Sequence, residues 1–242
     1  MSYVELSERL LEALIDGDRA ASRAVVDDAH TMGSTAEDIV AELYWPTYET
    51  IEKLYRGDQL SNMGHHLATR LLRTLVDQAS QHFDYQPSNG RTVFAVCGPT
   101  DADELAGQIA ADFIEREGYS IKYAGGGIAS DEVLEMVQTS QPDVLLLFAS
   151  APSDLPDIRA LIDQLGEIGA CRKTQIVVGG GVFNRAEGLA EEIGADLWAE
   201  DPCELCEVLL KQATRRATAE QRTVGRKARP QPVSTGGSRK VA

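Results

Sequence analysis

The sequence predicts an α/β protein in which an N-terminal four-helix bundle precedes a doubly wound, flavodoxin-like parallel sheet of five strands. The first observation is the helical spacing of apolar residues through almost all of the first 85 residues. The second is a change of pattern after the polar linker 86–91, where short apolar runs alternate with amphipathic stretches. Four helices with short connections favour a bundle, and the alternation favours a parallel sheet with right-handed crossovers. We expect a helical domain over 1–85, an α/β domain over 91–216 and a basic tail over 217–242.

The helical region divides where its sequence supplies start and stop signals. A face of leucines from Leu6 to Leu14 predicts the first helix, which Gly17 ends. The third helix carries Pro46 in its middle, and a proline there removes a backbone hydrogen bond and should kink or divide that helix. The expected helices cover about 6–14, about 19–31, a stretch that begins after Ser34 or Thr35, and about 61–82.

The second half contains short, continuous apolar runs, as expected for parallel strands that are buried on both faces. The expected strands are Thr92–Cys97, 119–123, Val144–Phe148, 175–178 and a short fifth strand at 196–199. The expected helices between and after them cover about 103–117, 130–139, 154–169, 186–193 and 202–216. Ligands of such sheets bind at the carboxyl ends of the strands, so this edge is where a site is expected.

Composition and charge exclude several classes of protein. The net charge of −15 disfavours broad contact with nucleic acid or with an anionic membrane. No run approaches the roughly 20 apolar residues of a membrane-spanning helix, and the first residues are acidic, unlike a signal peptide. Four cysteines do not make a disulfide framework in a chain of 242 residues, and Cys97 reads as a buried small hydrophobe. We therefore expect a cytoplasmic protein with no membrane contact.

The charge is unevenly distributed along the chain. Residues 1–210 hold 14 basic and 37 acidic residues, a net charge of −23, whereas nine Lys or Arg stand against one Glu from Lys211 onward. The tail is also rich in Pro, Gly and Ser, a composition typical of disorder. Two interpretations stay open: an arm that makes weak contact with nucleic acid or an acidic partner, or a tail that is solvated or folds back on the acidic body.

Glycines and acids gather where the expected strands end. Gly179, Gly180 and Gly181 expose backbone that a ligand could approach closely, although a tight turn would also explain a glycine there. The run does not match a nucleotide-binding motif. Asp101 and Asp103 follow the first strand, where paired carboxylates could bind a divalent cation, and N-capping of the next helix by either residue is an equal alternative.

Long stretches of the chain resemble cobalamin-binding modules. The stretch from LLEALIDGDRAASRAVVDDAH to LSNMGHHLATRLLRTLV is similar to their helical cap, and TDADELAGQIAADFIEREGYSIKYAGGGI, VVGGGVFN and EIGADLWAED are similar to their binding domain. The family includes MerR-type light-sensing regulators and corrinoid proteins. The resemblance implies cobalamin or another corrinoid or tetrapyrrole, held between the cap and the α/β domain.

The resemblance also implies the residues of the site. The family motif DxHxxG, whose histidine ligates cobalt, corresponds here to Asp101, to Asp103 in place of the histidine and to Ala106 in place of the glycine. The sequence therefore argues against cobalamin bound through a histidine at this position, because the Asp103 carboxylate is a poor ligand for such a cobalt site. Ser150 occupies the family's serine turn.

The remaining implied contacts come from the fourth strand and from the cap. Gly179 and Gly180 correspond to the diglycine that packs against the nucleotide tail of the cofactor. In the cap, the resemblance places Tyr55 as an aromatic lid and His66 over the upper face, as a metal ligand. A solvated His66 is the alternative interpretation. Adjacent histidines point about 100° apart on a helix, so His65 would not face the same ligand.

Other unusual residues have plainer interpretations. Trp45, Tyr44 and Tyr48 are expected to pack inside the bundle. Cys203 and Cys206 form a CxxC at a helix start, which could be a redox pair, but coincidence is the favoured interpretation because the motif follows the last strand.

Three functions compete. The favoured one is a non-catalytic sensor that binds a corrinoid or related tetrapyrrole and acts through a protein partner in signalling or transcription regulation. The alternatives are an interaction module whose cofactor site has decayed, and a corrinoid carrier for a methyltransferase. No nucleophile with a paired base is evident, so catalysis by the protein itself is not expected. Association of several copies is left open.

Overall fold

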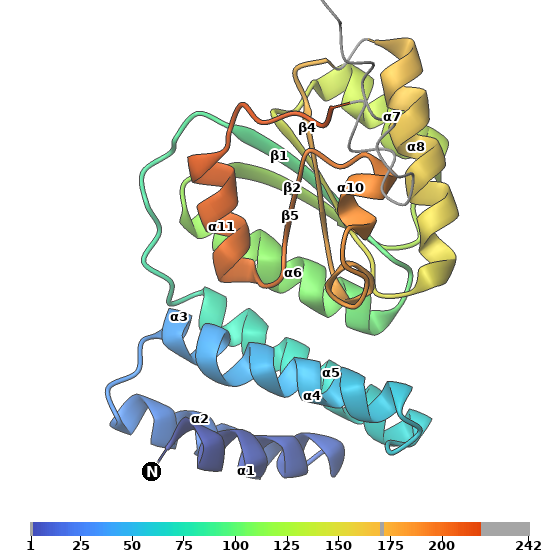
Figure 1. Ribbon diagram of the computed structural model, residues 1–242. Helices are drawn as coiled ribbons and strands as arrows, with labels where there is room; N and C mark the ends of the chain where they lie inside the picture. The colour runs from blue at the N-terminus through green and yellow to red at the C-terminus, as the bar shows by residue number, and fades with distance from the viewer. Residues whose placement is uncertain (1, 170–171, 219–242) are drawn as a thin grey trace, which may run out of the picture.

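The computed structural model describes residues 2–169 and 172–218, so the greater part of the expected tail lies outside the described residues. A layer of helices lies against one side of an α/β domain (Figure 1). No helix in the described ranges has the length and apolar character needed to cross a bilayer.

Four helical segments form the cap. Polar side chains begin them: Ser2 and Glu5 form a capping box, and Asp18 and Ser61 accept hydrogen bonds from the first turns of their helices. The segments are α1 Tyr3–Ile15, α2 Arg19–Thr31, α3 Ala36–Asp38 continuing through a π-helical segment Ile39–Tyr44 into α4 Trp45–Arg56, and α5 Asn62–Ser80. The expected disturbance at Pro46 is therefore a π-helical segment just before it, which admits the proline without breaking the helix.

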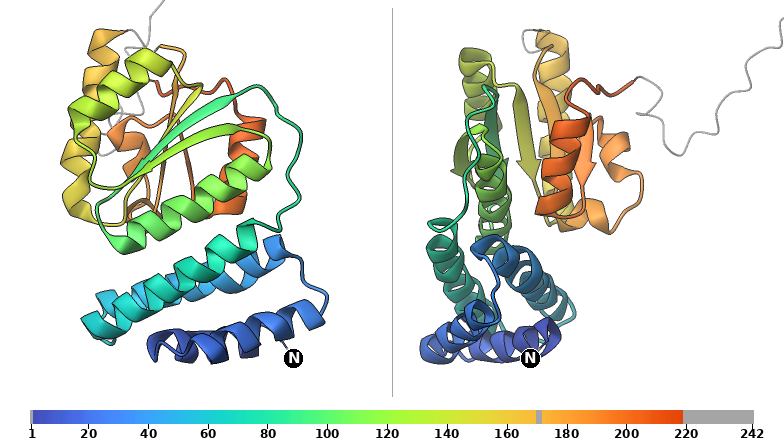
Figure 2. Two further views of the ribbon diagram at one scale, coloured as in Figure 1. Left: turned by 180° about the vertical axis from the view of Figure 1, so that it is seen from behind. Right: turned by 90° about the vertical axis from the view of Figure 1, so that its left-hand side faces the viewer.

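Five parallel strands form the sheet, in the order β2-β1-β3-β4-β5, which confirms the predicted fold class. The strands are β1 Thr92–Cys97, β2 Ser120–Gly125, β3 Val144–Phe148, β4 Gln175–Gly179 and β5 Leu197–Ala199. Helices α6 Asp101–Arg116 and α11 Pro202–Lys211 cover one face, and α7 Ser130–Ser140, α8 Leu155–Ile168 and α10 Leu189–Ile193 cover the other (Figures 1 and 2). The strand order reverses between β1 and β3, and ligands of doubly wound sheets bind at such a point.

Two helix boundaries differ from the sequence prediction. The helix expected at 186–193 begins only at Leu189, as α10, because Gly188 adopts a positive φ of 79° just before it, and a separate short helix, α9 Gly181–Asn184, precedes the expected range. The last helix ends at Lys211, not at 216, and Gln212 takes a non-helical conformation. The next residues run back along the sheet, where the amide of Gln175 donates hydrogen bonds to the carbonyl oxygens of Gln212 and Arg215.

Helix α6 joins the cap to the sheet. Ten of its 16 residues are buried, on all sides of the helix, because the sheet packs on one side and α5 on the other. Gly107 permits the close approach of β2, since a Cβ atom there would lie 2.8 Å from the Tyr123 hydroxyl oxygen. Phe83 stacks edge-on against Phe113 at 5.4 Å between ring centroids. One apolar cluster therefore runs from the cap through α6 into the sheet.

Asp112 on α6 provides a test of this packing. Burial, and secondarily the charges of Glu115 and Asp77, raise the pKa of Asp112 from its usual 3.8 to about 7. A raised folded-state pKa means that the fold binds the proton more tightly than the unfolded chain, so stability falls as pH rises from about 4 to 7. We expect Asp112→Asn to be more stable than the wild type by about 2 kcal/mol at pH 8 and equally stable near pH 4. Urea unfolding at both pH values measures the difference.

Asp27→Asn is the matched control, because Asp27 is exposed in the middle of α2. It should leave the stability difference near zero at both pH values. A gain of the same size in the Asp27 variant would attribute the effect to the overall negative charge of the protein and not to the α5–α6 packing.

Candidate functional site

Asp103 lies at the carboxyl end of β1 and is fully buried. Its Oδ2 atom accepts a hydrogen bond of 2.5 Å from the Thr100 hydroxyl, and its Oδ1 atom has no partner among the described residues. Thr100, not Asp101 or Asp103, is the N-cap of α6, and its side chain accepts the backbone N–H of Asp103 at 3.1 Å. The proposed N-cap role of the two aspartates is therefore wrong. Thr100 is the better cap because its hydroxyl both accepts that N–H and donates to the carboxylate.

A second carboxyl group, that of Asp154, lies beside Asp103. The Oδ2 atom of Asp154 is also buried without a partner in the described part of the chain. A Cβ atom on Gly98 would lie 2.7 Å from Asp103 Oδ2 and 3.1 Å from Asp154 Oδ2, so a glycine is required between them. Burial, and then the charge of Asp103, raise the pKa of Asp154. Because the two carboxyl groups lie close together, a negative charge on Asp103 disfavours a second one on Asp154.

The cap closes over the same edge through Tyr48 of α4. Tyr48 is 5% exposed, and it lies next to Ser150 in the turn after β3. Burial raises the pKa of Tyr48, so the phenol stays neutral. The Ser150 carbonyl oxygen also accepts a hydrogen bond of 2.6 Å from Nη2 of Arg185. Ser150 is thus held between the cap and the end of β4.

The glycines after β4 lie in a tight turn. Gly180 has a φ of 106°, and a Cβ atom on it would lie 2.2 Å from the Ala149 carbonyl oxygen. The turn alone therefore demands glycine at this position. Beside Gly179 and Gly180 the structure leaves a cavity of about 10 Å³, which is walled by Trp45 of the cap and by Phe148. A space of this size is about that of one water molecule.

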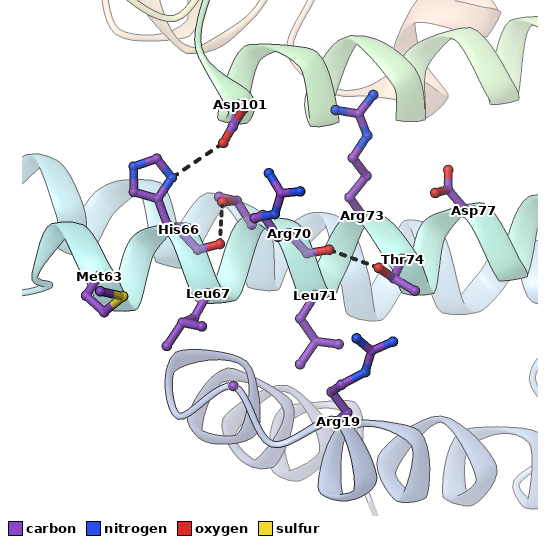
Figure 3. A pocket seen from close by; sticks show the side chains of 12 residues that line it. Arg19, Met63, His66, Leu67, Arg70, Leu71, Arg73, Thr74, Asp77 and Asp101 are labelled. Atoms are coloured by element: carbon purple, nitrogen blue, oxygen red, sulfur yellow. Dashed lines mark hydrogen bonds and ion pairs between the residues drawn. The ribbon is translucent and has the colours of Figure 1, made fainter.

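The expected cap residues separate into two environments. His65 is buried, its Nε2 lies 2.6 Å from Glu52 Oε1, and the Tyr55 ring stacks on it at 3.9 Å between centroids. His66 is exposed on the other side of α5, with Nδ1 3.4 Å from Asp101 Oδ2 (Figure 3). The structure therefore pairs Tyr55 with His65, and it pairs His66 with Asp101 across the boundary between cap and α/β domain.

The described residues do not assemble a metal or thiolate centre. The Asp101 carboxylate turns to His66 while that of Asp103 turns inward, and no group of three or more His, Cys, Asp or Glu with metal-binding geometry occurs in 2–169 and 172–218. Cys97 is half-buried, not fully buried. Burial raises the pKa of Cys97 to about 11 and of Cys206 to about 12, and it also raises the pKa of Cys203. Thiols in this state are protonated and poor nucleophiles, which supports the coincidental interpretation of the CxxC.

Sequence reasoning missed three residues of this edge. Tyr48 and Trp45 were assigned to bundle packing, yet one contacts Ser150 and the other walls the cavity beside Gly179. Asp154 lies in the segment ASAPSDLP, and its position after the third strand was the available signal. Trp45 and Tyr48 are one turn apart on α4, and this spacing indicates that they share one face of the helix. It does not indicate which part of the protein packs against that face.

Gly180→Ala measures the constraint in the turn after β4. The added Cβ would meet the Ala149 carbonyl oxygen at a positive φ, so we expect a loss of at least about 2 kcal/mol in the free energy of unfolding. Gly166→Ala in α8 is the control, since nothing lies within 4 Å of its Cβ position. That change should stabilise the protein by about 0.5–1 kcal/mol. An equal, small effect of both substitutions would show that the turn can relax.

Asp154→Asn tests the shared charge. Because the pKa of Asp154 is raised in the folded protein, stability falls as pH rises above 3.8, the ordinary pKa of an Asp carboxyl group. An amide at position 154 does not ionise, so it removes this loss of stability, and its NH2 group can donate a hydrogen bond to Asp103. We expect the variant to be more stable at pH 8 by about 1 kcal/mol or less, because solvent screens the partly exposed group, with the difference vanishing near pH 4. If Asp154→Asn were less stable than the wild type at pH 8, repulsion between the Asp103 and Asp154 carboxyl groups would be ruled out. Thermal unfolding across pH measures this.

A corrinoid protein is among the solved structures that share this fold, and two further structures match less closely. The monomethylamine corrinoid protein of Methanosarcina barkeri matches with a TM-score of 0.75 and 16% identity, over 87% of this chain and 99% of that one. A cobalamin-binding protein of Desulfitobacterium hafniense matches with a TM-score of 0.46 and 14% identity, over 87% and 98%. The methanol:cobalamin methyltransferase complex MtaBC of M. barkeri matches with a TM-score of 0.48 and 16% identity, over 90% and 83%. No protein of curated function matches the chain.

The donor set does not fit a cobalamin held by a protein histidine. The residue that the resemblance aligns with that imidazole is Asp103, whose carboxylate is buried and bonded to Thr100. The space beside Gly179 and Gly180 is about 10 Å³, which admits no nucleotide tail while the cap is closed. Any tetrapyrrole at this edge would therefore need the cap to move and an axial ligand from elsewhere.

Family membership rests on two separate sequence patterns. One pattern, described as a B12 binding domain, matches residues 91–207, which hold the sheet and its helices. A second B12 binding domain pattern matches residues 6–79, which hold α1 to α5. Together they cover the cap and the α/β domain in the order in which the fold displays them. The chain belongs to the family of cobalamin-binding domain proteins.

Proposed function

We propose that this protein is a non-catalytic sensor that binds a corrinoid or related tetrapyrrole between the cap and the α/β domain and acts through a protein partner. The observation that carries the proposal is the close approach of the buried Tyr48 of the cap to Ser150 at the strand ends. It occupies the edge where ligands of doubly wound sheets bind. A ligand at this edge therefore competes with the closed cap, and its occupancy becomes a change in domain arrangement.

Family membership supports corrinoid binding in general, and the residues suggest its form. Since Asp103 replaces the imidazole, the ligand would be held without an axial histidine from the α/β domain. The imidazole of His66 in the cap is exposed. The family resemblance places it over the upper face of the cofactor, so we propose His66 as the upper ligand once the cap has moved. The raised pKa values of the three described cysteines support a non-catalytic role.

A second candidate is an interaction module that binds no cofactor. The cavity of about 10 Å³ beside the diglycine favours it, since Trp45 and Phe148 fill the space. A corrinoid carrier role is less well supported, because the axial ligand that tunes cobalt would be missing. The weak nucleic-acid contact proposed for the tail concerns residues that lie mostly outside the described ones.

The test is retention of a corrin spectrum. The protein is incubated with about 100 μM hydroxocobalamin or adenosylcobalamin and separated from free ligand by gel filtration, and we expect the corrin absorption to co-elute near one equivalent. Tyr48→Phe should bind about fivefold more tightly, because the closed cap loses the polar contact of the Tyr48 hydroxyl near Ser150, worth about 1 kcal/mol. Tyr3→Phe is the matched control, since its hydroxyl bonds Ser34 inside the cap.

The outcomes separate the two candidates. A colourless protein peak means a binding free energy weaker than about 5 to 6 kcal/mol for cobalamin and leaves the cofactor-free module. Retained colour with equal affinity in the Tyr48 and Tyr3 variants would mean that the ligand does not compete with the closed cap. Asp103→His should change the visible spectrum of bound hydroxocobalamin by adding an imidazole, whereas Asp131→His on the exposed start of α7 should not.

A further inference from the structure

A hollow of about 700 Å³ runs along the outward side of α5, and we name it the α5 groove. Its lining consists of Gly17, Arg19, Met63, His66, Leu67, Thr69, Arg70, Leu71, Arg73, Thr74, Asp77 and Asp101. Figure 3 shows Arg70 and Arg73 on the side of α5 that faces α6, and Leu67, Leu71 and Arg19 toward the turn between α1 and α2. From Met63 to Asp77 the groove follows α5 for about 21 Å. That length suits about four turns of another helix.

The floor of the groove is apolar and accessible. Met63 is 69% exposed and Leu67 is 41% exposed, and they are four residues apart, so they lie on one face of α5. The turn at Gly17 forms the lower wall, since its Cβ position lies 3.4 Å from Leu67. Two neighbouring apolar side chains within a walled groove are the type of anchor that receives an amphipathic helix.

The polar side chains around this floor leave positive charge uncompensated. Asp77 accepts a hydrogen bond from Gln108, and Asp101 faces His66, so both acids of the lining are engaged. Arg73 pairs with Glu104 at 2.8 Å. The side chains of Arg19 and Arg70 are exposed, and their guanidinium groups take part in no hydrogen bond or ion pair within the described ranges. Two free guanidinium groups thus flank exposed apolar side chains on a protein whose residues 1–210 carry a net charge of −23.

We propose that the α5 groove binds an acidic amphipathic helix of a partner protein. The proposal rests on the proposed function in one respect, that the protein acts through a partner, and it names the surface and the chemistry of that partner. Charge selects the occupant: the acidic body repels acidic proteins elsewhere, whereas the groove attracts them through Arg19 and Arg70. A nucleic acid would be repelled by the net negative charge of the rest of the protein. A small anion would leave the apolar side chains of Met63 and Leu67 exposed to solvent.

The position of the groove gives the partner access to the state of the cap. His66 and Asp101 face each other across the boundary between cap and α/β domain at one end of the groove. Movement of the cap would separate α5 from α6 and so alter the wall formed by Asp101 and Arg73. Partner affinity and cap position are therefore linked, because a helix in the groove contacts both domains only when the cap is closed.

The experiment uses the full chain and a synthetic probe. The probe is a fluorescein-labelled peptide of about 18 residues with leucines along one helical face and glutamates beside them. We expect saturable binding with a Kd below about 100 μM by fluorescence anisotropy. Arg19→Glu combined with Arg70→Glu should weaken binding at least about tenfold, and Met63→Gln about threefold. A peptide with lysine at every glutamate position should bind at least about tenfold more weakly.

Lys53→Glu combined with Lys122→Glu is the matched control, because both lysines are exposed, lie outside the groove and change the net charge equally. This variant should stay within about twofold of the wild type at 150 mM salt. Equal losses in both double variants, equal binding of both peptides, or no saturation at about 1 mM peptide would each overturn the proposal. A dimer in light scattering that Arg19→Glu with Arg70→Glu dissociates would instead identify a second copy as the occupant.

The outcome is distinguishable from failure of the proposed function. Peptide binding is measured without any cofactor, and corrin retention is measured without any peptide. If the protein elutes colourless but binds the acidic peptide, the proposal for the α5 groove stands and the proposal of corrinoid binding fails. A coloured protein that ignores the peptide does the reverse.

Discussion

Helix α6 is the element on which both halves of this molecule depend. It is buried between the sheet and α5, and small residues such as Ala106 and Gly107 keep its two sides close to their neighbours. The cap therefore shares one apolar cluster with the sheet and is not an appendage on a linker. Any movement of the cap must expose part of this cluster, which makes the closed form the stable one without a ligand. The same helix also carries Asp103 at its first turn, so packing and site chemistry are coupled.

The buried carboxyl pair shows how one replacement changes the chemistry of a shared fold. A histidine at position 103 would bring a nitrogen ligand to the strand ends, whereas Asp103 brings a negative charge that needs a proton or a cation. Asp154 meets it from the turn after β3, where burial, and then the charge of Asp103, raise the pKa of Asp154. Gly98 makes the approach sterically allowed. The edge is thus built for a compact, closed arrangement and not for an axial imidazole.

Charge and shape together separate two surfaces with different roles. At the strand edge Tyr48 of the cap lies next to Ser150 and the acid groups are buried, whereas the α5 groove presents Arg19 and Arg70 beside apolar side chains. His66 and Asp101 lie where the two surfaces meet. A ligand that displaces the cap would alter both surfaces at once, because α5 belongs to the cap, lines the α5 groove and packs against α6 next to the strand edge. This arrangement couples the two proposed binding events without a further domain.

The sequence by itself determined the elements and their order. Leucine spacing, the break at Gly17 and the alternation of strands and helices are local signals, and they were sufficient to predict the bundle, the sheet and the strand-end location of the unusual residues. Tertiary structure alone decided the partners. Asp103 and Asp154 are 51 residues apart, and Tyr48 and Ser150 are 102 apart, so no local spacing indicates that they meet. Periodicity reports which face of an element is apolar, but the direction of a single side chain is set by the packing of distant segments.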